Sequence, residues 1–97
     1  MRIPVEVSGI AADGSAVRED AHTGVVGVHG AMIRMSCALK MGAVVDLTNR
    51  FSQQTAKFRV VWMKDHEEGD LWEIGVESLK PLGDFWGVKF PAKKNLP

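Results

Sequence analysis

Apolar and polar residues alternate with a period of two through most of this chain. The first segment shows the pattern at its simplest, with apolar residues at Ile3, Val5 and Val7. A period of two places successive side chains on opposite faces, which is typical of a β-strand with one buried face. No long window repeats with the period of a helix. The chain is therefore expected to be all-β.

Turn signals divide this pattern into short strands. The dipeptide Asp13-Gly14 is typical of a β-hairpin. Residues 17–20 should begin the return strand, and the next strand should cover residues 21–28. Later strands are expected near residues 31–37, 45–47, 58–62 and 72–76, separated by a bend at residues 40–42, a turn at Thr48-Asn49 and a polar loop at residues 64–70.

The number and spacing of these strands predict a small barrel. The chain has 97 residues, enough for a single domain, here residues 1–97. Closing a sheet of six or so short strands removes its unpaired edges. Residues 81–91 are expected to cover one end of the barrel, with three aromatic side chains packing back on the sheet: Phe85, Trp86 and Phe90.

Alternation also predicts which side chains face the core. Phe58, Val60 and Trp62 should share the inner face of one strand, and Trp72 should face inward on the last strand. Cys37 should be buried, since it follows Ile33 and Met35 on the apolar face of its own strand. Three apolar residues fall on outer faces and could contact a partner: Val44, Val61 and Met63.

Charge and composition exclude several classes of protein. Twelve basic residues balance twelve acidic ones, so no overall field attracts nucleic acid or an anionic membrane. The single cysteine cannot form an internal disulfide, and the chain opens on a strand pattern rather than a signal peptide. No apolar run approaches the roughly 20 residues of a membrane helix. We expect a cytoplasmic protein without membrane insertion.

The residue types used in catalysis and metal binding are scattered. The three histidines and the cysteine stand at positions 22, 29, 66 and 37, without the spacing of a zinc site. The carboxylate pairs Glu19-Asp20 and Glu67-Glu68 are adjacent residues, which point to opposite faces of a strand and cannot converge on one bond. We therefore expect no catalytic residues, no metal and no cofactor, and the chain is not predicted to be an enzyme.

The segment TGVVGVHGAMI, residues 23–33, combines three glycines with several β-branched residues. Such a segment is either a turn that binds a ligand or only the bend between two strands. This segment and four others occur in an order and with a spacing that resemble a known family. The five segments are RIPVEV (2–7), TGVVGVHGAMI (23–33), GAVVDLT (42–48), RVVW (59–62) and EIGVE (73–77).

Together these segments resemble the PilZ domain family over nearly the whole chain. The resemblance implies a six-stranded antiparallel β-barrel in a bacterial signalling protein, and cyclic di-GMP as the usual ligand. The family holds this ligand with an Arg-x-x-x-Arg stretch before the first strand and with an Asp/Asn-x-Ser-x-x-Gly turn. A guanidinium suits the ligand because it can bind phosphate and the guanine edge with two parallel hydrogen bonds.

The family motifs map only partly onto this chain. Arg2 resembles the second arginine, and the first would lie before Met1. In the turn, Gly30 matches the family glycine, which is expected to permit a tight bend. Val25 replaces the Asp/Asn and Gly27 replaces the serine, so two hydrogen-bonding side chains are lost. His29 lies between the motif positions and could stack on a base or donate to phosphate.

Two functions follow from this mapping. The first is a PilZ-like regulatory domain in which cyclic di-GMP binding is weakened or lost and which acts through contacts with a protein partner or adjoining domain. The alternative is a functional cyclic di-GMP receptor that uses Arg2, the 25–30 turn and an arginine upstream of this chain.

Overall fold

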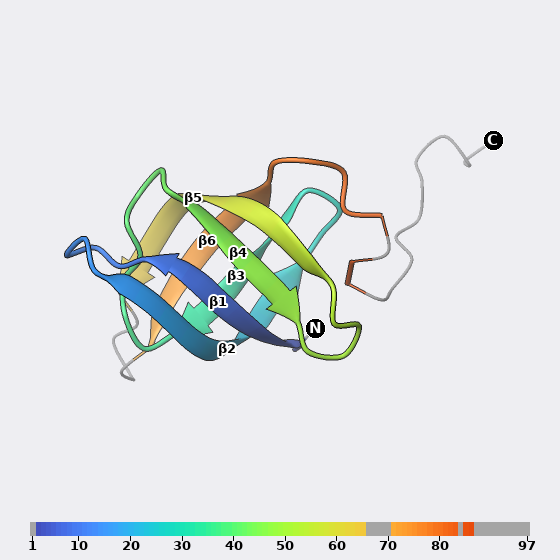
Figure 1. Ribbon diagram of the computed structural model, residues 1–97, viewed down its shortest axis with the longest axis horizontal. Helices are drawn as coiled ribbons and strands as arrows, with labels where there is room; N and C mark the ends of the chain where they lie inside the picture. Colours follow the sequence, from blue (N-terminus) through green and yellow to red (C-terminus); the bar gives the residue numbers. More distant parts are fainter. Residues whose placement is uncertain (1, 66–70, 84, 87–97) are drawn as a thin grey trace.

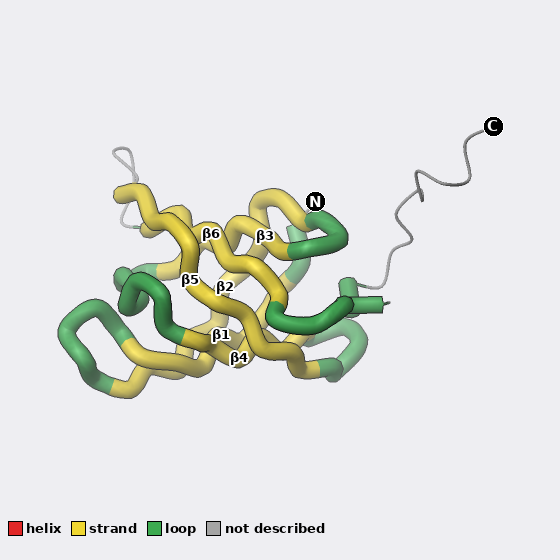
Figure 2. The backbone as a smooth tube through the Cα atoms, turned by 90° about the horizontal axis from the view of Figure 1, so that it is seen from above, coloured by secondary structure: helices red, strands yellow, loops and turns green. Residues whose placement is uncertain are grey.

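The computed structural model describes residues 2–65, 71–83 and 85–86, and these form an all-β fold. The six strands are β1 (Pro4–Ile10), β2 (Ala16–Val26), β3 (Gly30–Met35), β4 (Val44–Asn49), β5 (Thr55–Asp65) and β6 (Trp72–Ser78). The described residues contain no helix (Figure 2). The predicted six-stranded antiparallel barrel is therefore confirmed.

The strands close into a barrel in the order β1-β2-β3-β6-β5-β4. Each neighbouring pair is antiparallel, and the pairing of β1 with β4 completes the ring. In the view of Figure 1, β1 and β4 lie in front, with β3 and β6 behind them. Closure pairs every strand with two neighbours, although residues 25–26 of β2 pair only with β3 and residues 62–65 of β5 pair only with β6.

The predicted turns are present between the described strands. Asp13-Gly14 forms the β1–β2 hairpin, where the Asp13 carboxylate accepts a hydrogen bond from the Ser15 amide at 2.9 Å. Gly14 and Gly42 have φ values of 91° and 78°, in the left-handed region that favours glycine. The Asp13-Gly14 turn fixes the register of β1 and β2, whereas the turn at Gly42 leads from β3 to β4, which do not pair with each other.

Alternate residues of the strands fill the interior, as the period of two predicts. The buried apolar side chains are Ile3, Val5, Val7, Ile33, Met35, Leu39, Val45, Leu47, Phe58, Val60, Ile74, Val76, Phe85 and Trp86. Phe85 and Trp86 pack edge to face, with ring centroids 4.7 Å apart, and both contact Phe58. The aromatic cover predicted at these two positions is confirmed, whereas Phe90 lies outside the described residues.

Asn49 joins this aromatic cover to the β4–β5 turn. Its side chain is 1% exposed. The Nδ2 group donates to the Phe85 carbonyl at 2.7 Å, and Oδ1 accepts from the Phe51 amide at 2.9 Å. One buried amide therefore satisfies backbone groups from two segments that are far apart in the sequence.

Three boundary predictions are corrected. Residues 16–26 form one continuous strand, β2, instead of a return segment followed by a new strand at residue 21. Lys64 and Asp65, assigned to the polar loop, are the last residues of β5. Strand β3 ends at Met35, so Cys37 follows the strand and is only partly buried.

A β-bulge at Val61 corrects the prediction for the second half of β5. Val60 pairs with Val76 and Trp62 with Gly75, so Val61 is an extra residue in the ladder. Trp62 consequently points outward and is 45% exposed, where the alternation had placed it in the core. Met63, predicted on the outer face, packs against the core instead. Val44 and Val61 are exposed as predicted.

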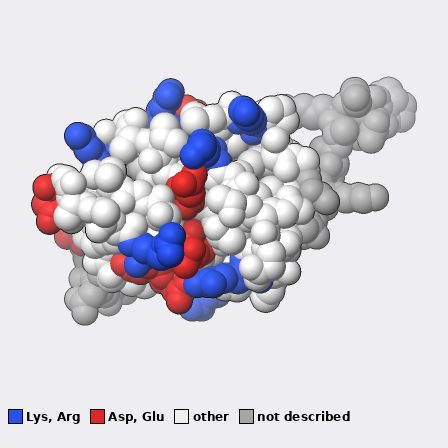
Figure 3. Space-filling view, in the orientation of Figure 1, with Lys and Arg blue, Asp and Glu red and all other residues white. Residues whose placement is uncertain are grey.

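The face formed around β1 and β4 carries charges of both signs. Figure 3 shows acidic and basic side chains interspersed along the middle of this face. Arg50 forms ion pairs with Glu6 and Asp20, and Lys57 pairs with Asp46 at 3.0 Å. The charges on this face therefore partly cancel one another.

Candidate functional site

The opposite side of the barrel carries a row of apolar residues across four strands. Val25 on β2 pairs with Met32 on β3, Met32 pairs with Gly75 on β6, and Gly75 pairs with Trp62 on β5. β2 has a second bulge, at Gly24, immediately before Val25, just as the bulge at Val61 in β5 comes immediately before Trp62. The two bulges bring Val25 and Trp62 onto the outer face, in register with Met32.

Trp62 lies directly over Gly75. A Cβ atom at Gly75 would be 2.0 Å from the indole Nε1 and 2.3 Å from Cε2, so only glycine leaves room for the ring. The row is nevertheless open to solvent, since Val25 is 60% exposed and Trp62 is 45% exposed. An exposed tryptophan held against backbone in this way is a rigid apolar contact surface.

These residues form the walls of a shallow groove, which we call the Trp62 groove. It is lined by Val25, Val26, Gly27, Gly30, Ala31, Met32 and Trp62. None of these side chains ionises, and the indole N–H is the only polar side-chain group among them. The groove can therefore offer apolar contact and aromatic stacking, but no acid–base chemistry from its own side chains.

A polar row borders the groove on one side. His22, Arg34, Glu73 and Lys64 are paired in that order across β2, β3, β6 and β5. Arg34 donates from Nε and Nη2 to Glu73 Oε2, at 3.3 Å and 3.1 Å. Desolvation, with the nearby charges of Arg2 and Arg34, lowers the pKa of His22 below 6.5. His22 is therefore less readily protonated than a free imidazole, and the positive charge of this border that is not in an ion pair within the described residues belongs to Arg2 and Lys64.

Three of the sequence-predicted site residues are brought together in the Trp62 groove: Val25, Gly27 and Gly30. His29 is exposed in the β2–β3 turn and lines a different cleft, formed with residues 78–83. Arg2 is exposed before β1. Hydrogen bonds between Ile3 and Thr23 place it alongside β2, close enough to His22 to affect the pKa of that imidazole.

The role expected for Gly30 is corrected. Gly30 is not among the glycines with positive φ, so the turn does not need glycine for its conformation. A Cβ at this position would instead lie 2.2 Å from the Val76 carbonyl oxygen. Glycine is required here because β3 and β6 approach closely.

The sequence pattern missed Trp62 as a surface residue. Trp62 was assigned to the core because strict alternation continues from Phe58 through Val60. Nothing in the residue types around Val61 distinguishes a bulge from a regular strand. The extra residue is apparent only from the pairing with β6.

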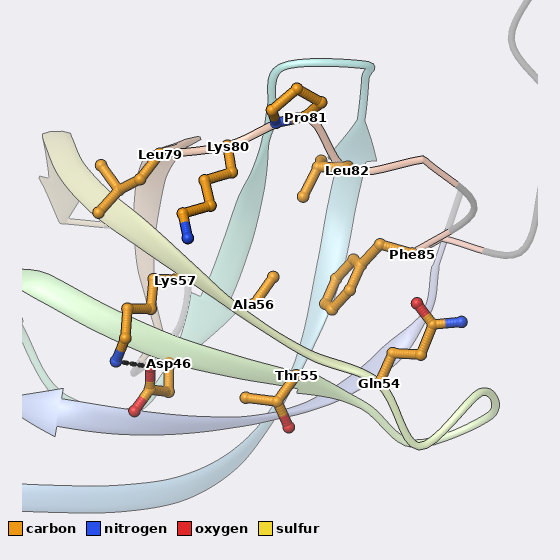
Figure 4. Close-up of a pocket in the computed structure, with 10 residues that line it drawn as sticks. All are labelled: Asp46, Gln54, Thr55, Ala56, Lys57, Leu79, Lys80, Pro81, Leu82 and Phe85. Atoms are coloured by element: carbon orange, nitrogen blue, oxygen red, sulfur yellow. Dashed lines mark hydrogen bonds and ion pairs between the residues drawn. The ribbon is translucent and has the colours of Figure 1, made fainter.

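A second cleft lies between β4, β5 and the segment that follows β6 (Figure 4). Leu79, Pro81 and Leu82 line one side, and Lys57 and Asp46 form an ion pair at 3.0 Å on the other. Lys80 points from the first side toward Lys57. No sequence-predicted site residue lines this cleft, and its Asp46 carboxylate is already paired. The Trp62 groove is therefore the stronger candidate site.

The described carboxylates of the paired motifs have separate structural partners. Glu19 accepts hydrogen bonds from the amide and hydroxyl of Ser36, both at 2.6 Å. Asp20 pairs with Arg50. Glu67 and Glu68, with His66, lie outside the described residues. Within the described part of the chain, no three His, Cys, Asp or Glu side chains are grouped to hold a metal ion.

Comparisons with protein-family models, curated proteins and solved structures find no match to this chain. In the described ranges, no helix is long and apolar enough to span a membrane.

Proposed function

We propose that the chain is a PilZ-like regulatory domain that binds cyclic di-GMP weakly or not at all and acts by contacting another protein or an adjoining domain. The six-stranded closed antiparallel barrel supports this proposal, because it is the fold that the resemblance implies. The positions that resemble the family's ligand turn also lie together on one outer surface, in the Trp62 groove.

The observation that carries the proposal is the chemistry of that groove. At the Asp/Asn position stands Val25, exposed and without a polar side-chain atom, and at the serine position stands Gly27. A guanine edge placed there would exchange hydrogen bonds to water for apolar contact. Each unsatisfied group costs about 1 to 3 kcal/mol, so the two losses together would weaken binding by orders of magnitude.

Calorimetric titration of the chain with cyclic di-GMP tests the proposal. We expect no saturable heat at micromolar concentrations of the dinucleotide. Saturable micromolar binding would refute the proposal and favour the alternative, a functional receptor. That alternative draws its support from Arg2, which lies on the border of the groove beside His22.

A gain-of-binding variant checks the motif alignment independently. Val25→Asn and Gly27→Ser, with an added N-terminal segment carrying arginine four residues before Arg2, should restore the missing contacts. Both substitutions are compatible with the fold, since Val25 is exposed and a Cβ at Gly27 would have its nearest contact at 3.9 Å. A folded variant that gains no affinity would show that the 25–30 turn is only a bend.

A further inference from the structure

We infer that the Trp62 groove docks an acidic amphipathic helix of a partner protein, laid across β2, β3, β6 and β5. This inference rests on the proposed function and identifies the surface and the partner chemistry that it requires. Val25, Met32 and Trp62 form the apolar row on which the helix lies.

The apolar row has the composition of a binding surface. Trp62 and Val25 stand at its two ends, and both are large hydrophobic side chains left substantially exposed. Tryptophan is enriched among residues that dominate binding energy. Gly27 has no side chain, and a Cβ there would have its nearest contact at 3.9 Å, so backbone atoms of a partner can approach this end of the groove closely.

The direction of the row decides the form of the partner segment. A peptide that extended the sheet would pair along the edge of β5 at residues 62–65, which pair only with β6, and would not lie across the row. A helix needs no such pairing, since it satisfies its own backbone hydrogen bonds. Neighbouring strands are roughly 4.8 Å apart, so the row from β2 to β5 measures roughly 14 Å, or about two and a half helical turns.

The border formed by His22, Arg34, Glu73 and Lys64 decides the polarity of the helix, because on the other border the acidic Glu77 lies opposite the basic Arg59. Arg34 and Glu73 neutralise each other as an ion pair. Arg2 and Lys64 stand toward the two ends of the same border, and within the described residues neither forms an ion pair. Carboxylates on the flank of the helix that faces this border would meet both cations.

The shape of the surface favours a protein over a membrane. The apolar row lines a groove, whereas insertion into a lipid surface requires a protruding apolar face. The chain also has no net charge to hold it on an anionic bilayer.

To test the inference, helical peptides of about 16 residues are displayed on phage and selected for binding to the whole chain. The same library is then depleted on the variant Trp62→Ser. We expect surviving peptides to carry apolar residues at helical spacing with Asp or Glu beside them. A synthetic survivor should shift the amide resonances of residues 25–32 and the indole N–H of Trp62 in NMR spectra.

Two variants separate docking at the groove from nonspecific hydrophobic binding. The double variant Arg2→Glu and Lys64→Glu should weaken the selected peptide by about tenfold or more, a loss that added salt reproduces in the wild type. Phe51→Ser is the matched control, because Phe51 is an aromatic side chain, 76% exposed, in the β4–β5 turn. It should leave the affinity for the peptide unchanged.

Several outcomes would overturn the inference. These are a library that yields no survivors, survivors that bind Trp62→Ser equally well, survivors rich in Lys and Arg, or resonance shifts that map elsewhere. The groove would instead be a membrane-binding surface if the wild-type chain sedimented with vesicles containing one-third phosphatidylserine and Trp62→Ser did not. None of these outcomes changes the result for cyclic di-GMP, which the calorimetric titration of the proposed function tests separately.

Discussion

The indole ring of Trp62 occupies the space above Gly75 in which any other residue would place its Cβ atom. We predict that Gly75→Ala destabilises the fold by about 1 to 3 kcal/mol, the usual cost of overpacking. The cause is displacement of the ring, because the added methyl would lie 2.0 Å from Nε1. Urea unfolding measures the loss of stability.

A double-mutant cycle identifies the source of this cost. Trp62→Ala removes the ring, so Gly75→Ala introduced into that background should cost much less than in the wild type. An equal cost in both backgrounds would show that the β6 backbone, and not contact with the indole, makes alanine unfavourable at this position.

Asn49 should be among the polar residues to which stability is most sensitive. Asn49→Ala leaves the Phe85 carbonyl with only the Ser52 hydroxyl, at 3.4 Å, and removes the acceptor of the Phe51 amide, at about 1 to 3 kcal/mol for each group left buried and unsatisfied. Thr55→Ala, at the start of β5, breaks only the exposed hydrogen bond to the Thr48 hydroxyl; it serves as the control and should change the free energy of unfolding by less than about 1 kcal/mol. Equal effects for the two variants would contradict the role of Asn49.

The lowered pKa of His22 makes the stability of the fold dependent on pH. Its causes are desolvation first, then the charges of Arg2 and Arg34. Because the unfolded chain takes up a proton more readily than the folded chain, the contribution of His22 is fully present above pH 6.5 and is lost as the pH falls through the lowered folded pKa. Arg2→Gln should raise the pKa of His22, as measured by NMR titration of the ring. A ring pKa above 6.5 in the wild type would refute this prediction.

Cys37 should react slowly with thiol reagents, although it is only partly buried. Desolvation raises the pKa of its thiol, and the Glu19 carboxylate, 3.8 Å from Sγ, raises it further. Glu19→Gln removes the negative charge and should speed labelling at pH about 8, without reaching the rate of the unfolded chain. Labelling of the native wild type as fast as in urea would rule out this environment.

Local patterns in the sequence predict most of this fold because strands and hairpin turns leave local signals. Asp13-Gly14 indicates a hairpin from two residues, and Ile3, Val5 and Val7 identify an inner face without any knowledge of their partners. The site depends on pairing between strands that are distant in sequence. Trp62 turns outward only because Val61 is left out of the ladder with β6, and that register is a property of the whole ring.

The glycine of the β2–β3 turn illustrates the same limit. A family pattern can mark Gly30 as special, but the reason for the glycine lies in Val76, 46 positions further along the chain, whose carbonyl would contact the missing Cβ. Asn49 is similar, since its bond to the Phe85 carbonyl spans 36 positions. Long-range contacts of this kind leave no periodic signal in the sequence.

The bulge at Val61 also affects how insertions and deletions act in this barrel. Before it, alternate residues of β5 face inward at Phe58 and Val60; after it, the inward position moves to Met63. Deleting Val61 alone would therefore leave Val60 opposite Val76 and Trp62 opposite Gly75, and would turn the bulge into a regular ladder. A homologous barrel without the bulge would be one residue shorter here, and its hydrophobic pattern would match this chain only across a gap.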